Sequence, residues 1–138
     1  EKLAIMGKQL YAELERDISP ACKIRNLFRV RVGLVWEHRT FYRIFFHGTT
    51  VPVCDPRAGF SAEAWERYQE FVKKQEAVFL QGIENGEFLP VAATMLTLIF
   101  EGIQRAYADY VTGDDNPPRV PEQEEALLEI FMRGATVA

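Results

Sequence analysis

The sequence has few of the residues from which catalytic and metal sites are commonly built. It contains only two histidines and two cysteines in 138 residues, too few and too widely spaced for a zinc pattern or a disulfide framework. It has no His-Glu-x-x-His motif, no glycine-rich phosphate loop and no Gly-x-Ser-x-Gly motif. We therefore expect no metal, no cofactor and no enzymatic activity.

Long hydrophobic runs and an excess of positive charge are also missing. The most apolar stretches, such as 91–100, are broken by polar residues and fall well short of the ~18 apolar residues of a membrane span. Lys plus Arg is 16 and Asp plus Glu is 20, a net charge of −4, which disfavours non-specific binding to nucleic acid or anionic membranes. No signal peptide is visible, although the chain begins at Glu1 and not at Met. These features predict a cytoplasmic protein.

The apolar residues that are present follow helical spacing throughout. Ser19 before Pro20 and Ser61 before an Ala-Glu-rich segment are typical helix starts, and Asn85-Gly86 is a typical helix end. No segment alternates with period two. The sequence predicts one all-α domain over 1–138, a helical bundle of about six helices, at 1–17, 20–37, 41–47 after a Thr40 cap, 61–85, 90–113 and about 121–135.

Two polar side chains interrupt the apolar stripes of these helices. Gln75 falls between Tyr68 and Phe79 on one stripe, and Arg31 falls in the middle of another. Because an unpaired buried polar group is costly, each either pairs internally or faces a cavity where a ligand satisfies it. For Arg31 that ligand would be an anion or carry a carbonyl group. The candidate ligand-binding residues are Arg31, Trp36, Phe46, Tyr68, Gln75, Phe79 and Phe100.

The last two helices are apolar on more than one side. In 90–112 the polar residues occupy an arc of only about 100° on a helical wheel, and in the last helix they form a narrow strip. One apolar face of each helix would pack on the core and the other on a partner. The alternative is that both helices are central in a monomer.

Three segments together resemble a known family. The segment 79–88 reads FLQGIENGEF, in which a glycine is followed by three residues and then by Gly-Glu-Phe. It is similar to the end of a helix in the regulatory domain of the tetracycline-repressor (TetR) family. The aromatic segment 39–46 resembles the short helix before that family's long loop. Leu127, Ile130, Phe131 and Gly134 resemble its final helix. The resemblance covers essentially the whole chain, with the segments in the same order as in the family.

The resemblance implies a one-component transcriptional regulator, usually a repressor, that releases DNA when a small hydrophobic and possibly anionic effector binds. DNA would be bound only by an N-terminal helix-turn-helix domain that is absent from this chain. The effector would occupy a cavity among the helices starting near Pro20, Thr40, Ser61 and Pro90. The last two helices would form a dimeric four-helix bundle in a homodimer, with the interface residues Ile103, Tyr107, Leu127, Ile130, Phe131 and Gly134.

A helical interaction or scaffold module without a small ligand is the alternative. The two hypotheses differ in packing, because a ligand sensor encloses a cavity of several hundred Å³. A scaffold is packed at normal interior density.

Overall fold

A computed structural model describes residues 2–47 and 61–137, with the side chains of 2, 3 and 45–47 outside the description. Within these ranges the chain is helical and has no strand, so the prediction of an all-α bundle of about six helices is confirmed. The helices are α1 (Lys2–Leu14), α2 (Pro20–Glu37), α3 (Arg39–His47), α4 (Ala62–Glu84), α5 (Ala93–Val111) and α6 (Pro121–Ala135).

The helix signals written in the local sequence are confirmed. The Ser19 hydroxyl accepts a hydrogen bond from the Cys22 amide at the start of α2, and the Ser61 hydroxyl accepts one from the Ala64 amide at the start of α4. At the end of α4, Gly86 has φ of +81°, a left-handed conformation that glycine adopts without steric penalty.

Three predicted helix boundaries were wrong. Helix α1 ends at Leu14, because residues 15–18 turn the chain back towards α2. Helix α3 begins at Arg39, so Thr40 lies in its first turn and is not its cap; the His38 carbonyl accepts the first bond, from the Tyr42 amide.

Helix α5 begins at Ala93 and not at Pro90, because the preceding residues pair with the end of the chain. The Leu89 amide donates to the Ala135 carbonyl at 2.8 Å, and the Val137 amide donates to the Glu87 carbonyl at 3.0 Å. These backbone bonds hold 87–89 extended beside the C-terminus of α6.

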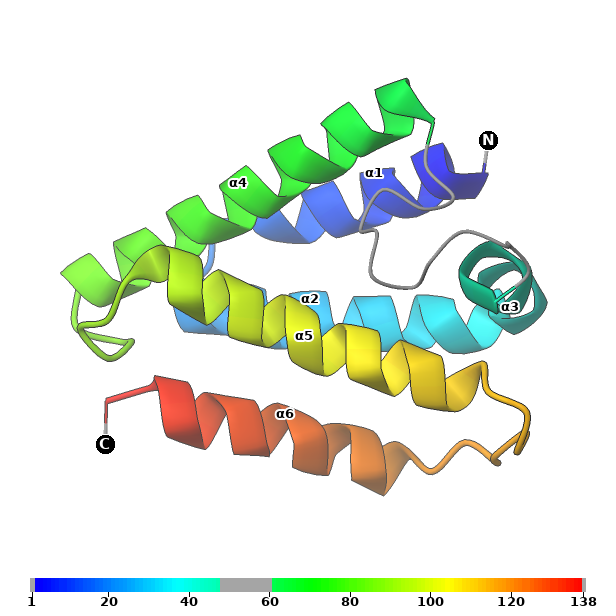
Figure 1. Cartoon of the computed structure of the whole chain (residues 1–138). Helices are drawn as coiled ribbons and strands as arrows, with labels where there is room; N and C mark the ends of the chain where they lie inside the picture. The colour runs from blue at the N-terminus through cyan, green and yellow to red at the C-terminus, as the bar shows by residue number, and fades with distance from the viewer. Residues whose placement is uncertain (1, 48–60, 138) are drawn as a thin grey trace.

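The helices are stacked in layers (Figure 1). Helices α1 and α4 run side by side in the same direction, with the Tyr11 and Phe71 rings 5.6 Å apart and Lys74 near Glu15. Helices α2 and α5 form the next layer, α6 packs against both of them, and α3 lies across one end.

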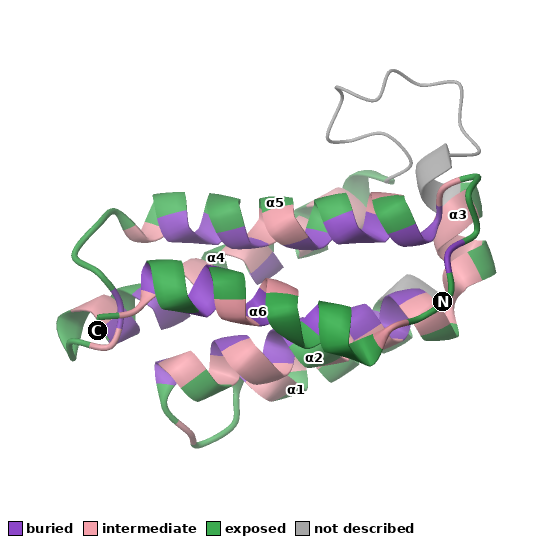
Figure 2. Cartoon of the chain, turned by 90° about the horizontal axis from the view of Figure 1, so that it is seen from below, coloured by how far each residue is buried: buried purple, intermediate pink, exposed green. Residues whose placement is uncertain are grey.

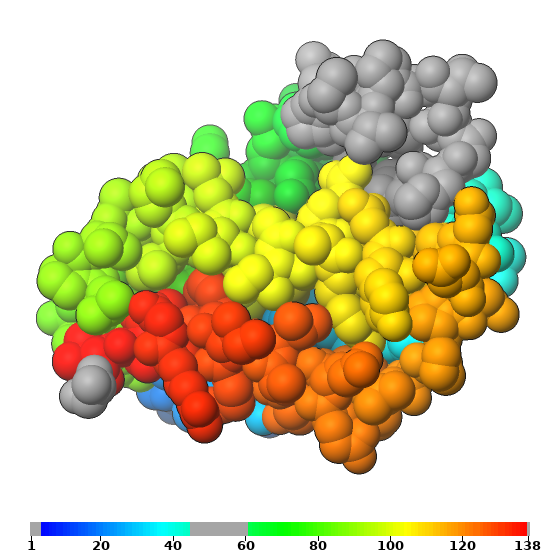
Figure 3. All heavy atoms as spheres, turned by 60° about the horizontal axis from the view of Figure 1, so that its bottom comes forward, coloured from blue at the N-terminus to red at the C-terminus, as the bar shows by residue number. Residues whose placement is uncertain are grey.

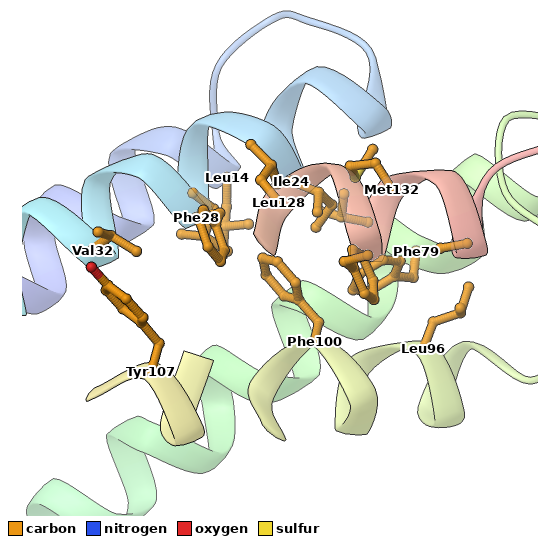
Figure 4. Close-up of a cluster of buried hydrophobic side chains, with 14 of the residues drawn as sticks. Leu14, Ile24, Phe28, Val32, Phe79, Leu96, Phe100, Tyr107, Leu128 and Met132 are labelled. Atoms are coloured by element: carbon orange, nitrogen blue, oxygen red, sulfur yellow. The ribbon is translucent and has the colours of Figure 1, made fainter. Parts of the chain in front are cut away.

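The core is a cluster of phenylalanine rings from different helices (Figure 4). The ring of Phe79 from α4 lies 5.8 Å from Phe100 of α5 and 6.0 Å from Phe131 of α6. Phe28 of α2 and Phe88 complete the cluster, and all five residues are buried. The core is therefore solid at its centre, and any ligand site must lie beside it.

Candidate functional site

A polar cluster of Arg31, Glu101 and Tyr68 joins three helices beside this core. The Arg31 Nη1 atom of α2 donates to Oε2 of Glu101 on α5, and the Tyr68 hydroxyl of α4 donates to the other carboxylate oxygen at 2.7 Å. The side chain of Glu101 is only 11% exposed, and that of Arg31 is 23% exposed. Of the two alternatives for Arg31, the structure shows the internal ion pair.

The electrostatics of this cluster keep Arg31 charged and Tyr68 neutral. Burial opposes the charge of the Arg31 guanidinium, but attraction to Glu101 outweighs it, so the pKa of Arg31 is raised. Burial and the neighbouring Glu101 charge also raise the pKa of Tyr68 well above its usual value. Tyr68 therefore remains a neutral phenol whose hydroxyl donates a hydrogen bond to Glu101.

Two cavities meet at this cluster. The smaller, of about 270 Å³, lies between α2, α3, α4 and α5. The larger, of about 730 Å³, is a groove bounded by α1, α3 and α4 with Arg31 of α2 at its wall. Arg31, Tyr42 and Tyr68 line both cavities.

The guanidinium of Arg31 has more donors than its ion pair uses. It carries five N–H groups, and Glu101 is the hydrogen-bond acceptor that the described part of the chain offers it. The Phe71 ring lies 5.7 Å from the guanidinium carbon on the side of the larger cavity. The cluster can therefore donate further hydrogen bonds into the cavities.

Among the predicted ligand-binding residues whose side chains the structure describes, Arg31 and Tyr68 line the cavities. Phe79 and Phe100 are fully buried in the phenylalanine core. The indole of Trp36 donates from Nε1 to the Tyr107 hydroxyl at 3.1 Å and does not line either cavity. The side chain of Phe46 lies outside the described residues.

Gln75 is buried but reaches neither cavity. It is 0% exposed, and neither its Oε1 nor its Nε2 has a hydrogen-bond partner among the described residues. It does not pair with Arg31, which is bound to Glu101. Its role in ligand binding stays a prediction.

The sequence reasoning missed Glu101, Tyr42 and the contribution of α1 to the site. Glu101 lies on the narrow polar strip of α5 and points inward to a partner 70 residues away in the chain. The expected cavity omitted the first helix, but Leu10 and Tyr11 of α1 line the larger one. The signal in the sequence was a carboxylate among the few polar residues of a mostly apolar helix, since a buried Arg31 needs an acidic partner.

The predicted dimer residues divide into two groups. Ile130 is 67% exposed, Gly134 is exposed, and Leu127 and Ile103 are half-buried. Phe131 and Tyr107 instead face the protomer's own core. Tyr107 is further fixed because its hydroxyl donates to Glu124 of α6, which Arg119 holds in a two-bond ion pair.

Large apolar residues of α5 and α6 are exposed on two helices that carry many exposed positions in Figure 2 and lie side by side on the face shown in Figure 3. We call this the α5–α6 apolar face; its large members are Met95, Leu98, Ile99, Tyr110 and Ile130. Gly102 and Gly134 on the same two helices have open space around them. Helix α5 thus has a second apolar side in addition to the one in the core, whereas the outer side of α6 within the described residues offers Ile130 among mostly charged residues.

No cluster of histidine, cysteine or acidic residues suited to a metal occurs within 2–47 and 61–137. Across the same described ranges, no helix is both long and apolar enough to cross a bilayer. No protein-family model, curated protein or solved structure matches the chain.

Proposed function

We propose that this chain is the effector-binding and dimerisation domain of a TetR-like transcriptional regulator, which releases DNA when a small apolar ligand binds. The observation that carries the proposal is the larger cavity. Its volume of about 730 Å³ lies within the range of about 300–1,000 Å³ typical of small-molecule sites. A scaffold module has no reason to keep such a space open beside a solid core.

The walls of the cavity suit a ligand with an apolar body. Leu10 and Tyr11 of α1, Phe41 of α3 and Phe71 of α4 provide apolar surface, and Arg31 provides hydrogen-bond donors at one place. The walls also carry the charged residues Lys8, Glu15, Arg67 and Glu70. A mixture of apolar surface with placed polar groups is characteristic of sites that bind and orient small molecules.

The α5–α6 apolar face supports the second half of the proposal. Several large apolar residues exposed on α5, with Ile130 on the adjacent α6, are typical of an interaction surface, and two copies joined through it would form a four-helix bundle. DNA would be contacted by a helix-turn-helix domain outside this chain. The ligand would act by binding one arrangement of the dimer more tightly than the other.

Native mass spectrometry of the purified protein tests the proposal in one experiment. We expect a dimer that carries a small co-purified molecule, and a ligand-free dimer whose melting temperature rises when an apolar compound library is added. A protein that carries no ligand and responds to no compound would favour the alternative, a helical interaction module that uses the α5–α6 apolar face alone.

A further inference from the structure

The charge of Arg31 is already balanced, and this limits what ligand the site can take. Glu101 is held from two sides, by Arg31 on one oxygen and by Tyr68 on the other. It is also nearly buried, at 11% exposure. An incoming anion would have to break both bonds to displace this carboxylate.

An anion that did not displace Glu101 would lie beside a buried negative charge. Two carboxylates sharing a site of low polarity repel each other, and one of them is forced to take up a proton. Among the other cations of the walls, Arg67 pairs with Glu63, and Arg105 lies 3.7 Å from Asp109. Lys8 of α1 is exposed, where solvent and salt screen its charge.

A neutral acceptor meets none of these penalties. The remaining N–H groups of Arg31 are charge-assisted donors, and a carbonyl oxygen can accept from them while Glu101 stays in place. The apolar part of the ligand would then lie along α1 and α4, against Tyr11 and Phe71.

We propose that the cavity binds an uncharged apolar compound whose carbonyl oxygen accepts a hydrogen bond from Arg31, and that it rejects the corresponding carboxylate. The inference rests on the proposed function and narrows it, because the sequence alone left an anionic effector open. It names the ligand class as apolar esters, ketones or amides.

Matched ester and acid pairs test this directly. Binding of methyl decanoate and decanoate, and of the methyl ester of biphenylcarboxylic acid and the free acid, is measured at about pH 7.5, where the acids are ionised. We expect at least one ester to bind the wild-type chain about tenfold or more tightly than its acid. This comparison needs no variant and is independent of any effect on folding.

Two variants then assign the preference to the ion pair. In Glu101→Gln the charge of Arg31 is no longer balanced, so we expect the preference to reverse in favour of the acid. In Arg31→Met we expect the ester to lose its advantage. Glu84→Gln, which removes an exposed carboxylate at the end of α4, is the matched control and should bind like the wild type.

The outcomes separate this inference from the function on which it rests. An acid that binds as tightly as its ester, or more tightly, overturns the neutral-ligand proposal while the effector-binding domain stands. An ester preference that Glu101→Gln leaves unchanged also overturns it. If neither member of either pair binds, the neutral-ligand proposal fails, and the effector-binding function is decided separately by native mass spectrometry and the compound library.

Discussion

Among the residues that the structure describes, Gln75 is the one whose burial is least compensated. Its amide is enclosed completely, and both of its polar atoms lack partners among the described residues. Gln104 is a milder case, because its Nε2 donates to the Phe100 carbonyl at 3.1 Å and only its Oε1 lacks a partner there. The comparison separates a wholly unsatisfied amide from a half-satisfied one.

We expect Gln75→Met to stabilise the protein. The substitution keeps the length of the side chain and removes a desolvated amide, whose burial without partners costs about 1–3 kcal/mol. Urea unfolding should show an increased free energy of unfolding, with a smaller change for Gln104→Met as the matched control. A loss of stability in Gln75→Met would mean that the amide has a partner that holds it in place.

At the residue scale, sequence patterns predicted which side chains are unusual but not what they contact. The helical wheel placed Gln75 and Arg31 on buried stripes, and both are at least partly buried. The partner of Arg31 could not be read, because Glu101 is brought to it by the packing of α5 on α2 and not by any local spacing.

At the scale of elements, the junction after α4 shows how a local motif is used in packing. The Gly82 carbonyl accepts from the amides of Glu87 and Phe88, which folds the chain back over the end of the helix. A Cβ atom on Gly82 would overlap the Phe88 ring and lie 3.2 Å from the Pro20 Cβ atom. The glycine is needed because the buried Phe88 ring lies directly on the helix.

Gly82→Ala should therefore destabilise the chain, although alanine favours a helix by about 1 kcal/mol over glycine. The Phe88 ring is buried and packed 5.0 Å from Phe79, so a shift of the ring would disturb the core, and overpacking of this kind costs about 1–3 kcal/mol. Gly33→Ala in α2, where nothing lies within 4 Å, is the control and should raise the melting temperature. Equal gains in both variants would contradict the packing of Phe88 on Gly82.

The existence of the helices was predictable because caps and apolar periodicity are local features of the sequence. Predicted helix boundaries were wrong where contacts with distant segments set the end of a helix. Ser19, Ser61 and Gly86 act on the next few residues, so their signals were correct. The start of α5 was wrong because Leu89 is bonded to Ala135 at the other end of the chain. Similarly, no local spacing could have predicted the ion pairs that Arg25 and Arg29 form with Glu129 and Glu125 of α6.

At the scale of the whole molecule, the apolar periodicity of the last two helices leads to the α5–α6 apolar face. For α5 the predicted second apolar side is exposed, with Met95, Leu98, Ile99 and Tyr110 on it. For α6 the prediction was too strong, because Ile130 is the large apolar residue exposed on a mostly charged outer side. Which predicted interface residues face outward was only partly predictable, because Phe131 and Tyr107 are buried in the protomer's own core, whereas Ile130 is exposed. The rotation of each helix depends on its packing partners.

Ile130→Glu should prevent self-association without unfolding the protomer. Ile130 is 67% exposed, so a glutamate is tolerated in the single chain, but it would place an unpaired charge within the interface at a cost of about 2 kcal/mol or more. Ile5→Glu replaces an isoleucine that is also exposed, on α1, which does not contact α5 or α6. This control should leave association unchanged, as measured by light scattering after gel filtration.

Sedimentation velocity of the wild-type protein at micromolar concentration is the most direct test of the central claim, that the chain is a dimerising effector domain. We predict a single species with twice the chain mass of 15.8 kDa, as expected when an interface of about 1,200–2,000 Å² or more is buried. A folded protein that sediments as a monomer throughout this range would contradict the account.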